Sequence, residues 1–202
     1  YYTSTVYWFK YEPIKWRILK ESDGKALILA DLALDSQQYY NLTYSGTELK
    51  NGKRVYANNY AESDIRKWLN NTFYNTAFTS LQKGLIEVTN VDNSVSSTGD
   101  DSNDYACENT NDNVFLLSYQ EVRTYSMGSS ERQMKSSDYA KSQGVDVDSS
   151  YGGTCSWWLR SPTYYDSCVG AHKVDGDGYL VRSYGVSYTG TGVLPALWIK
   201  LA

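Results

Sequence analysis

Short apolar runs bounded by turn residues occur at both ends of the chain and predict β-strands there. Residues 16–20 and 26–31 flank the dipeptide Asp23-Gly24, which is typical of a tight hairpin turn. From Cys155 onward the same pattern predicts four strands, over residues 157–160, 168–174, 179–186 and 193–201. We therefore expect an N-terminal hairpin and a C-terminal antiparallel meander.

Capping residues predict short helices between these strands. Ser63 is a favourable N-cap, and Ile65, Trp68 and Leu69 follow it at the spacing of a buried helical stripe. Capping-box or N-cap patterns predict three more short helices, beginning at Thr79, Ser118 and Ser137, the last of them ended by Gly144.

Two stretches lack any periodicity. Residues 36–62 are rich in Tyr, Asn and Gly and are expected to form a long irregular loop. Residues 89–112 are almost entirely polar and precede the apolar run at 114–117, so they are interpreted as a surface loop. Within that loop, Asp100, Asp101 and Asp104 are either oxygen ligands for calcium or a solvated acidic turn, and their spacing favours the turn.

Composition narrows the class of protein. The 202 residues are 41% hydrophobic and 21% charged, which is typical of a folded domain. We expect one domain over residues 1–202, with residues 1–15 as a peripheral N-terminal extension. The net charge of −4 and the scattered basic residues argue against a nucleic-acid partner. No run of 18 apolar residues is present, which argues against direct membrane insertion.

The numbers of histidine and aromatic residues indicate which kinds of site the chain can form. His172 is the only histidine, which excludes metal sites built on two imidazoles and leaves few routes to a triad enzyme. The chain has 20 Tyr and 6 Trp but only 4 Phe, so rings with a polar group predominate. Such rings suit exposed binding surfaces, although a Tyr-rich β core would also use them.

Five motifs in order carry a resemblance to a known family. They are Ile65–Asn71 followed by Phe73–Phe78, Val114–Ser118, Asp138–Lys141, Trp157-Trp158-Leu159-Arg160-Ser161-Pro162 and Pro195-Ala196-Leu197-Trp198-Ile199. Together they resemble a bacterial family of unknown function found in secreted and surface proteins of anaerobic gut bacteria. The resemblance covers residues 16–201.

That family is similar to the C-type lectin fold, in the branch that includes formylglycine-generating enzymes and the variable proteins of diversity-generating retroelements. The resemblance implies an α+β, C-type lectin-like fold, with short helices packed on a small antiparallel β-sheet core and long irregular loops. Leu194 stands where the family usually has Arg, which puts a buried ion pair at that position in doubt. The surroundings of Cys155 and Cys168 do not reproduce the copper-binding pair of the formylglycine-generating enzymes.

The Trp-rich motif has two interpretations. Arg160 can stack on an aromatic ring or clamp a ligand carboxylate, but pairing with an interior acid is the simpler expectation. Trp157, Trp158, Leu159 and Trp198 are assigned to the core.

The candidate ligand-binding residues lie in the C-terminal segment 163–191. In the lectin-type fold this segment forms the ligand-binding face, and in diversified members it holds the variable residues. A plain solvated β surface is the alternative. The candidates are Tyr164, Tyr165, Asp166, His172, Lys173, Arg182, Tyr184, Ser187, Tyr188 and Thr189.

We expect a non-enzymatic, extracellular or cell-surface module that binds a protein or a glycan without a cofactor, with any leader or anchor outside the sequence shown. One alternative is a carbohydrate-active enzyme that uses paired carboxylates. The other is a purely structural domain of a surface adhesin. The carboxylates considered for the enzyme are Glu108, Asp166, Asp175 and Asp177.

The three cysteines allow at most one intramolecular disulfide. Cys155 and Cys168 bracket the predicted strand at 157–160 and its following turn, whereas Cys107 lies in a different polar loop. In an exported protein we therefore predict a disulfide between Cys155 and Cys168.

Overall fold

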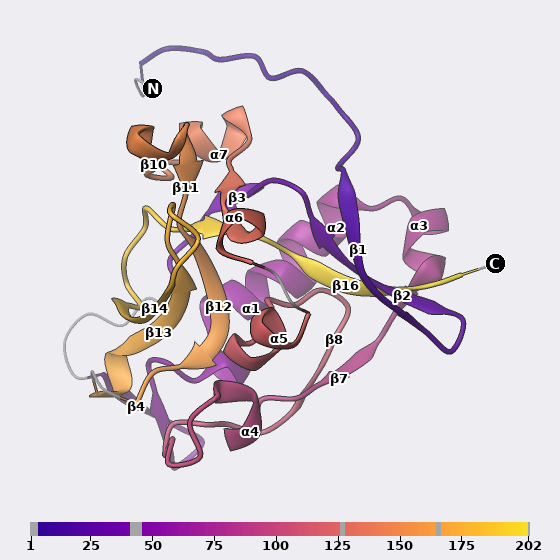
Figure 1. Ribbon diagram of the computed structural model, residues 1–202. Coiled ribbons are helices and arrows are strands. Elements are labelled where there is room, and N and C mark those ends of the chain that lie inside the picture. Colours follow the sequence, from indigo (N-terminus) through magenta and orange to yellow (C-terminus); the bar gives the residue numbers. More distant parts are fainter. Residues whose placement is uncertain (1–3, 41–45, 126–127, 165–166, 202) are drawn as a thin grey trace.

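The computed structural model describes residues 4–40, 46–125, 128–164 and 167–201 (Figure 1). It is a mixed α+β structure in which several small, mostly antiparallel sheets are joined by short helices and loops. The α+β class predicted from the sequence is therefore confirmed. None of the helices in the described part has the length and apolar character that a membrane span requires.

One sheet is built on the N-terminal hairpin. Strands β1 (Trp16–Ser22) and β2 (Lys25–Ala30) pair in antiparallel fashion, as predicted. Their turn residues Asp23 and Gly24 both have positive φ, of 53° and 69°, which a two-residue hairpin turn requires. Strand β16 (Ala196–Lys200) pairs with β2, and β6 (Ile86–Glu87) pairs with β16.

A second sheet is built on the C-terminal segment. Strands β12 (Trp157–Pro162), β13 (Gly170–Val174) and β14 (Leu180–Gly185) form the predicted meander. Strand β15 (Gly192–Val193) lies parallel to β12, and β3 (Asp35–Ser36) completes the sheet. The meander therefore ends at β14, since the last strand, β16, crosses to the first sheet. Figure 1 shows β16 running from beside β12 to the β1–β2 hairpin.

The predicted helices are confirmed at all four N-termini. The Ser63 side chain accepts a hydrogen bond from the Arg66 N–H at the start of α1 (Asp64–Trp68), which continues through a π-helical turn (Leu69–Phe73) into α2 (Tyr74–Ala77). Capping boxes begin α3 (Ser80–Leu85) and α5 (Tyr119–Thr124), and Ser137 caps α7 (Asp138–Ser142). The remaining helical segments are α4 (Val95–Thr98), α6 (Ser129–Arg132), and 3-10 turns at Tyr60–Glu62, Ser149–Tyr151 and Ser167–Val169.

Both stretches interpreted as loops contain regular structure, so those two predictions were wrong in part. Within 36–62, β4 (Thr47–Lys50) and β5 (Lys53–Tyr56) form a hairpin around Asn51 and Gly52, whose φ values are 51° and 77°. Asn-Gly is a strong hairpin signal that the surrounding polar composition masked. Within 89–112 lie β7 (Thr89–Val91), α4 and β8 (Thr110–Asp112), and the last small sheet contains β9 (Met134–Lys135), β10 (Val147–Asp148) and β11 (Thr154–Cys155).

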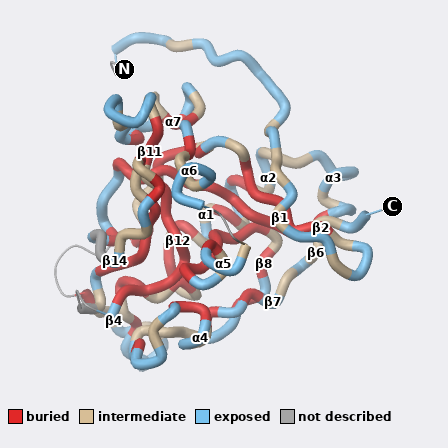
Figure 2. The backbone as a smooth tube through the Cα atoms, in the orientation of Figure 1, coloured by how far each residue is buried: buried red, intermediate tan, exposed pale blue. Residues whose placement is uncertain are grey.

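The core lies where the two larger sheets meet the helices (Figure 2). Trp157, Trp158 and Leu159 are fully buried, and Trp198 is half-buried against the same cluster, as their assignment to the core predicted. Each of the two buried indoles keeps a hydrogen bond, from Nε1 of Trp157 to the Arg132 carbonyl and from Nε1 of Trp158 to the Gln37 carbonyl. Strand β12 is thus fixed on both faces, and it forms the base on which the neighbouring loops rest.

Residues 4–15 contain no helix or strand. Figure 1 shows them as an arc that reaches β1 from above α7. Most of this segment is exposed, and the Trp8 side chain is 92% accessible. Phe9 packs edge-on against Tyr139 of α7 with ring centroids 5.7 Å apart.

Candidate functional site

Arg160 is a structural residue of the core. Its Nη2 donates to Oε1 of Glu121 at 2.9 Å, and its Nη1 donates to Oε2 of the same carboxylate and to the Leu116 carbonyl. Nη2 also donates to the Asp92 carbonyl at 3.0 Å. Because the Arg160 side chain is only 1% exposed, it is not available to a ligand. The prediction of pairing with an interior acid is confirmed.

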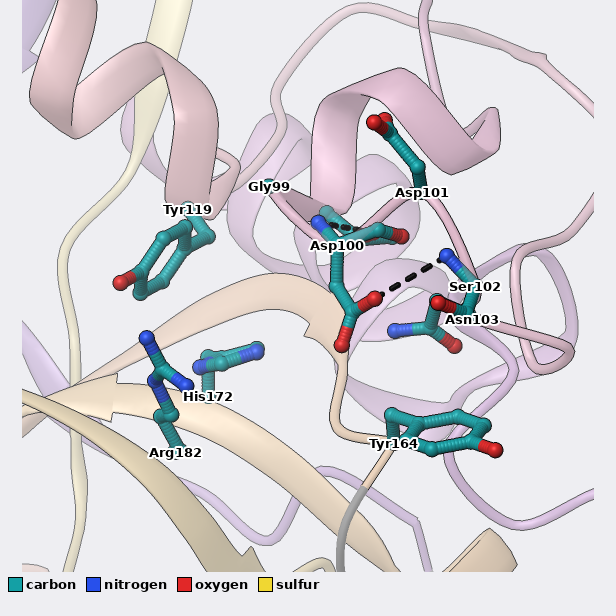
Figure 3. Close-up of a pocket in the computed structure, with 10 residues that line it drawn as sticks. Gly99, Asp100, Asp101, Ser102, Asn103, Tyr119, Tyr164, His172 and Arg182 are labelled. Carbon is teal, nitrogen blue, oxygen red and sulfur yellow. Dashed lines mark hydrogen bonds between the residues drawn. The ribbon is translucent and has the colours of Figure 1, made fainter.

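A polar pocket of about 400 Å³ lies directly beside this core. Its walls come from the turn after α4, from the first residue of α5, and from β13 and β14 (Figure 3). We call it the Asp100–His172 pocket. It is lined by Thr98, Gly99, Asp100, Asp101, Ser102, Asn103, Tyr119, Tyr164, His172 and Arg182.

The turn after α4 is rigidly shaped. Gly99 adopts φ +72°, and a Cβ built there would lie 2.5 Å from Cδ1 of Tyr119, so only glycine fits. The Asp100 carboxylate accepts a hydrogen bond from the Ser102 N–H at 3.0 Å. The Asn103 side chain donates to the Pro162 carbonyl at 2.9 Å, which fastens the turn to the end of β12. These contacts set the direction of the Asp100 side chain.

His172 forms the opposite wall. The residue is 5% exposed, and its ring packs on Tyr119 with centroids 4.6 Å apart. Burial lowers the pKa of His172 to about 4, the hydrogen bond with the Val181 backbone opposes this shift, and the nearby charges of Arg182 and Asp100 act in opposite directions. The imidazole is therefore neutral at pH 7. Its Nδ1 is buried and has no hydrogen-bond partner among the described residues.

The structure brings three of the ten predicted residues into this pocket: Tyr164, His172 and Arg182. Tyr164 is 43% exposed, and Figure 3 shows its ring across the cavity from His172 and Arg182. Ser187, Tyr188 and Thr189 are also exposed, but they lie in the turn after β14. Tyr165 and Asp166 lie outside the described residues, as does the side chain of Tyr184 in β14.

Lys173 was predicted to lie on the exposed ligand-binding face, but in the structure the residue is 6% exposed. Successive residues of a strand point to opposite sides, so Lys173 faces away from His172. Its side chain is 8% exposed, and its Nζ lies 2.8 Å from Oδ1 of Asp175. Nζ also donates to the Ser156 hydroxyl at 3.3 Å. His172, at 5% exposure, is likewise a buried pocket wall rather than a surface residue.

A second hollow, of about 370 Å³, lies on the Lys173 side of the sheet. Two of the four carboxylates considered for an enzyme, Asp175 and Asp177, line it together with Asp146 and Asp148. The Tyr188 hydroxyl donates to Asp146 at its edge. Glu108 lines a different hollow, beside the β4–β5 hairpin, and Asp166 lies outside the described residues.

The side chains of Asp100, Asp101 and Asp104 do not all line one cavity. Asp100 and Asp101 line the Asp100–His172 pocket, whereas Asp104 lines the hollow that contains Glu108. In the part of the chain that the structure describes, no group of three or more His, Cys, Asp or Glu side chains is placed to hold a metal ion.

The predicted disulfide between Cys155 and Cys168 is wrong. All three cysteines belong to described residues, and all three are free. Cys155 precedes β12, whereas Cys168 precedes β13, and these two strands pair in antiparallel fashion from Trp157–Val174 to Pro162–Ala171. The cysteines therefore lie at opposite ends of the hairpin, a strand length of roughly 17–20 Å apart, against about 6 Å between the Cα atoms of a disulfide.

Sequence reasoning missed the turn residues 98–103 and Tyr119 as parts of the site. For this segment either calcium ligands or a solvated acidic turn was expected from the sequence, and the spacing favoured the turn. The one local signal is Gly99, which ends α4 in the left-handed conformation and turns the chain toward Tyr119.

These features define a mixed α+β protein with a polar pocket between a helix-capping turn and the edge of a β-meander. Residues 23–201 match the family described as Domain of unknown function (DUF6273), and the chain belongs to this family. The predicted resemblance to a family of unknown function is confirmed at this level. No curated protein and no solved structure matches the chain.

Proposed function

We propose that this chain is a non-catalytic binding module that recognises a glycan in the Asp100–His172 pocket. The observation that carries the proposal is the meeting of Tyr164, His172 and Arg182 with the Asp100 turn around one cavity of about 400 Å³. Pockets of roughly 300–1,000 Å³ with a few converging polar groups are typical of small-ligand sites.

The chemistry of the lining favours a sugar over an apolar ligand. The half-exposed Tyr164 ring offers a flat surface for the C–H face of a sugar ring. The Asp100 carboxylate on one wall can accept hydrogen bonds, and the guanidinium of Arg182 on another can donate them. The hydroxyl groups of a sugar both donate and accept hydrogen bonds, so they can use both the acceptor and the donor in this pocket.

The C-type lectin-like fold and the location at the cell surface or outside the cell belong to the same proposal. The five ordered motifs and the arrangement of short helices around small sheets support a C-type lectin-like fold, in the branch of the retroelement variable proteins. In that branch the segment that contains Tyr164, His172 and Arg182 is the ligand-binding face. A glycan-binding module of this kind acts at the cell surface or outside the cell, without a cofactor. In a diversified member, sister sequences would differ mainly at positions 163–191.

A glycan array probed with the intact protein tests the proposal. We expect binding to a defined set of glycans, loss of that binding in Tyr164→Ala, and unchanged binding in Tyr179→Ala. Tyr179 is the matched control because it is 66% exposed and lies outside the pocket, in the turn before β14. Binding that survives Tyr164→Ala, or the absence of any glycan binding, would contradict the proposal.

The hollow on the Lys173 side supports one alternative, a carbohydrate-active enzyme. Asp175 and Asp177 lie there beside Asp146 and Asp148, and glycoside hydrolysis uses a pair of carboxylates. The release of reducing ends from polysaccharides, abolished in Asp175→Asn, would favour this alternative. If no reducing ends are released from any polysaccharide tested, the enzyme alternative is rejected and the binding module is retained.

A further inference from the structure

Strand β5 has one edge that no other strand covers. It belongs to a two-stranded sheet, and within the described residues it pairs only with β4. Because the hairpin turn has two residues, Lys50 and Lys53 exchange both of their backbone hydrogen bonds, and the backbone groups of Arg54 and Tyr56 point away from β4. Among the described residues, the N–H and C=O of Arg54 and the N–H of Tyr56 have no hydrogen-bond partner.

A groove of about 680 Å³ lies along this edge, and we call it the β5 groove. All four residues of β5 line it, whereas Lys50 at the turn is the one lining residue from β4, so the groove follows the edge of the hairpin rather than one of its faces. The opposite wall comes from the segment 104–108, which Tyr56 contacts through the Tyr105 ring with centroids 5.1 Å apart. Free backbone groups beside such a groove are suited to an added peptide strand. The groove shares no lining residue with the Asp100–His172 pocket.

The two walls of the β5 groove carry opposite charges. Lys53 and Arg54 are exposed on β5 and form no salt bridge among the described residues. Asp104 and Glu108 are exposed on the opposite wall, and they too form no salt bridge with any described residue. A peptide strand with an acidic side chain beside Arg54 and a basic side chain toward the acidic wall would therefore complement the groove.

A segment with this chemistry lies exposed near the start of the same chain. Residues 10–12 are Lys-Tyr-Glu, and their backbone groups make no hydrogen bond to the backbone of other described residues. The Lys10 and Glu12 side chains form an ion pair on one side of the segment, as residues i and i+2 of a strand can. The Tyr11 side chain between them is 95% exposed. The segment is thus an unpaired, extended piece of chain with the charges that the groove requires.

The segment cannot enter the β5 groove of its own chain. Trp16 is fixed in β1, and Glu12, four residues earlier, can lie at most about 14 Å from it. Figure 1 shows β1 and the hairpin that contains β4 on opposite sides of the molecule. The groove of a second copy is under no such constraint.

We propose that residues 10–12 of one copy add to β5 of a second copy as an antiparallel strand. Glu12 lies opposite Arg54, exchanges both backbone hydrogen bonds with it and places its carboxylate beside the guanidinium. Two residues earlier, the Lys10 carbonyl accepts the Tyr56 N–H, and its side chain points toward the acidic wall. Because the contact joins two different surfaces, the copies associate head to tail.

Sedimentation velocity over a range of protein concentrations tests this inference. We expect the wild-type chain to associate as its concentration rises. Arg54→Glu and Glu12→Arg should each associate at least tenfold more weakly, because each variant places two like charges in contact. An equimolar mixture of the two variants should associate again, since Glu12 of the first then meets Arg54 of the second. This recovery would also show that both variants fold.

Lys20→Glu is the control, because Lys20 is exposed on β1 and lines a different hollow. It should associate as the wild-type chain does. A wild-type chain that stays monomeric at every concentration would leave the groove to a peptide of another protein and overturn the inference. Association that persists in either charge-reversal variant, or a mixture that stays monomeric, would also overturn it. Glycan binding enters none of these outcomes, so the proposed function is tested separately.

Discussion

At the scale of single residues, His172 links stability to pH. Its pKa is about 4 in the folded protein, because the ring is buried, and about 6.5 in an unfolded chain. Between these values the unfolded state binds more protons, so the folded state loses stability as the pH falls. The contribution is fully present above pH 6.5 and is lost progressively toward pH 4.

We predict that the free energy of unfolding falls between pH 7 and pH 5 in the wild-type protein, by about 2 kcal/mol more than it falls in His172→Gln. The difference arises below pH 6.5, where it grows by roughly 1.4 kcal/mol for each pH unit. Urea unfolding at both pH values measures this difference. Because His172 is the only histidine, its Hε1 resonance also reports the pKa directly by NMR. An NMR pKa near 6.5, or equal pH dependence in the two proteins, would show that the imidazole is solvated.

The Arg160–Glu121 ion pair is a second residue-scale feature. Glu121 also accepts a hydrogen bond from the Ser118 N–H, so it closes the capping box of α5 as well as neutralising Arg160. Glu121→Gln preserves the capping geometry but leaves the buried guanidinium without a counter-charge. We predict a loss of about 3 kcal/mol of stability, the lower end of the range for a broken buried pair, because Glu121 is 27% exposed.

Chemical unfolding of Glu121→Gln measures this loss. The control is Asp138→Asn, which removes the exposed pair with Lys141 and should change stability by about 0.5 kcal/mol or less. Similar values for the two variants would mean that Arg160 finds another partner or reaches water.

At the scale of elements, the turn after α4 couples the pocket to α5. Gly99 and Gly152 have the same φ, +72°, but a Cβ at Gly99 meets the Tyr119 ring whereas a Cβ at Gly152 meets nothing within 4 Å. Gly152→Ala should therefore cost about 1 kcal/mol, the strain of a left-handed residue with a side chain. Gly99→Ala should cost about 3 kcal/mol, because overpacking is added to the same strain.

Thermal or chemical unfolding of this matched pair separates steric clash from backbone strain. Gly99→Ala should also shift the NMR resonances of His172, since Tyr119 packs directly on its ring. Equal costs for the two substitutions would mean that Tyr119 moves aside freely and that the pocket wall is soft.

At the scale of the whole molecule, the elements that sequence reasoning predicted are those fixed by local signals. Asp23-Gly24 and the N-caps at Ser63, Thr79 and Ser118 act within a few residues, and each is confirmed. The β4–β5 hairpin was missed even though its Asn-Gly turn is equally local, because composition was given more weight than the turn.

The site was predicted only in part, because it depends on contacts between distant segments. Tyr164, His172 and Arg182 come from the predicted C-terminal segment, but the acceptor wall comes from a turn some 60 residues earlier, held to β12 by Asn103. Strand alternation separates Lys173 from His172, and no composition argument reveals which of the two faces the pocket. The crossing of β16 to the N-terminal sheet is likewise a non-local pairing.

The central claim is that the Asp100 turn and the C-terminal strands form one ligand pocket. NMR titration with a glycan that binds on the array tests it most directly, with the single histidine as the reporter. We predict that the His172 resonance shifts saturably in the wild-type protein and that the shift is lost in Asp100→Asn, although His172 and Asp100 belong to different elements. Saturable binding that leaves the His172 resonance unchanged would place the ligand elsewhere and contradict the account.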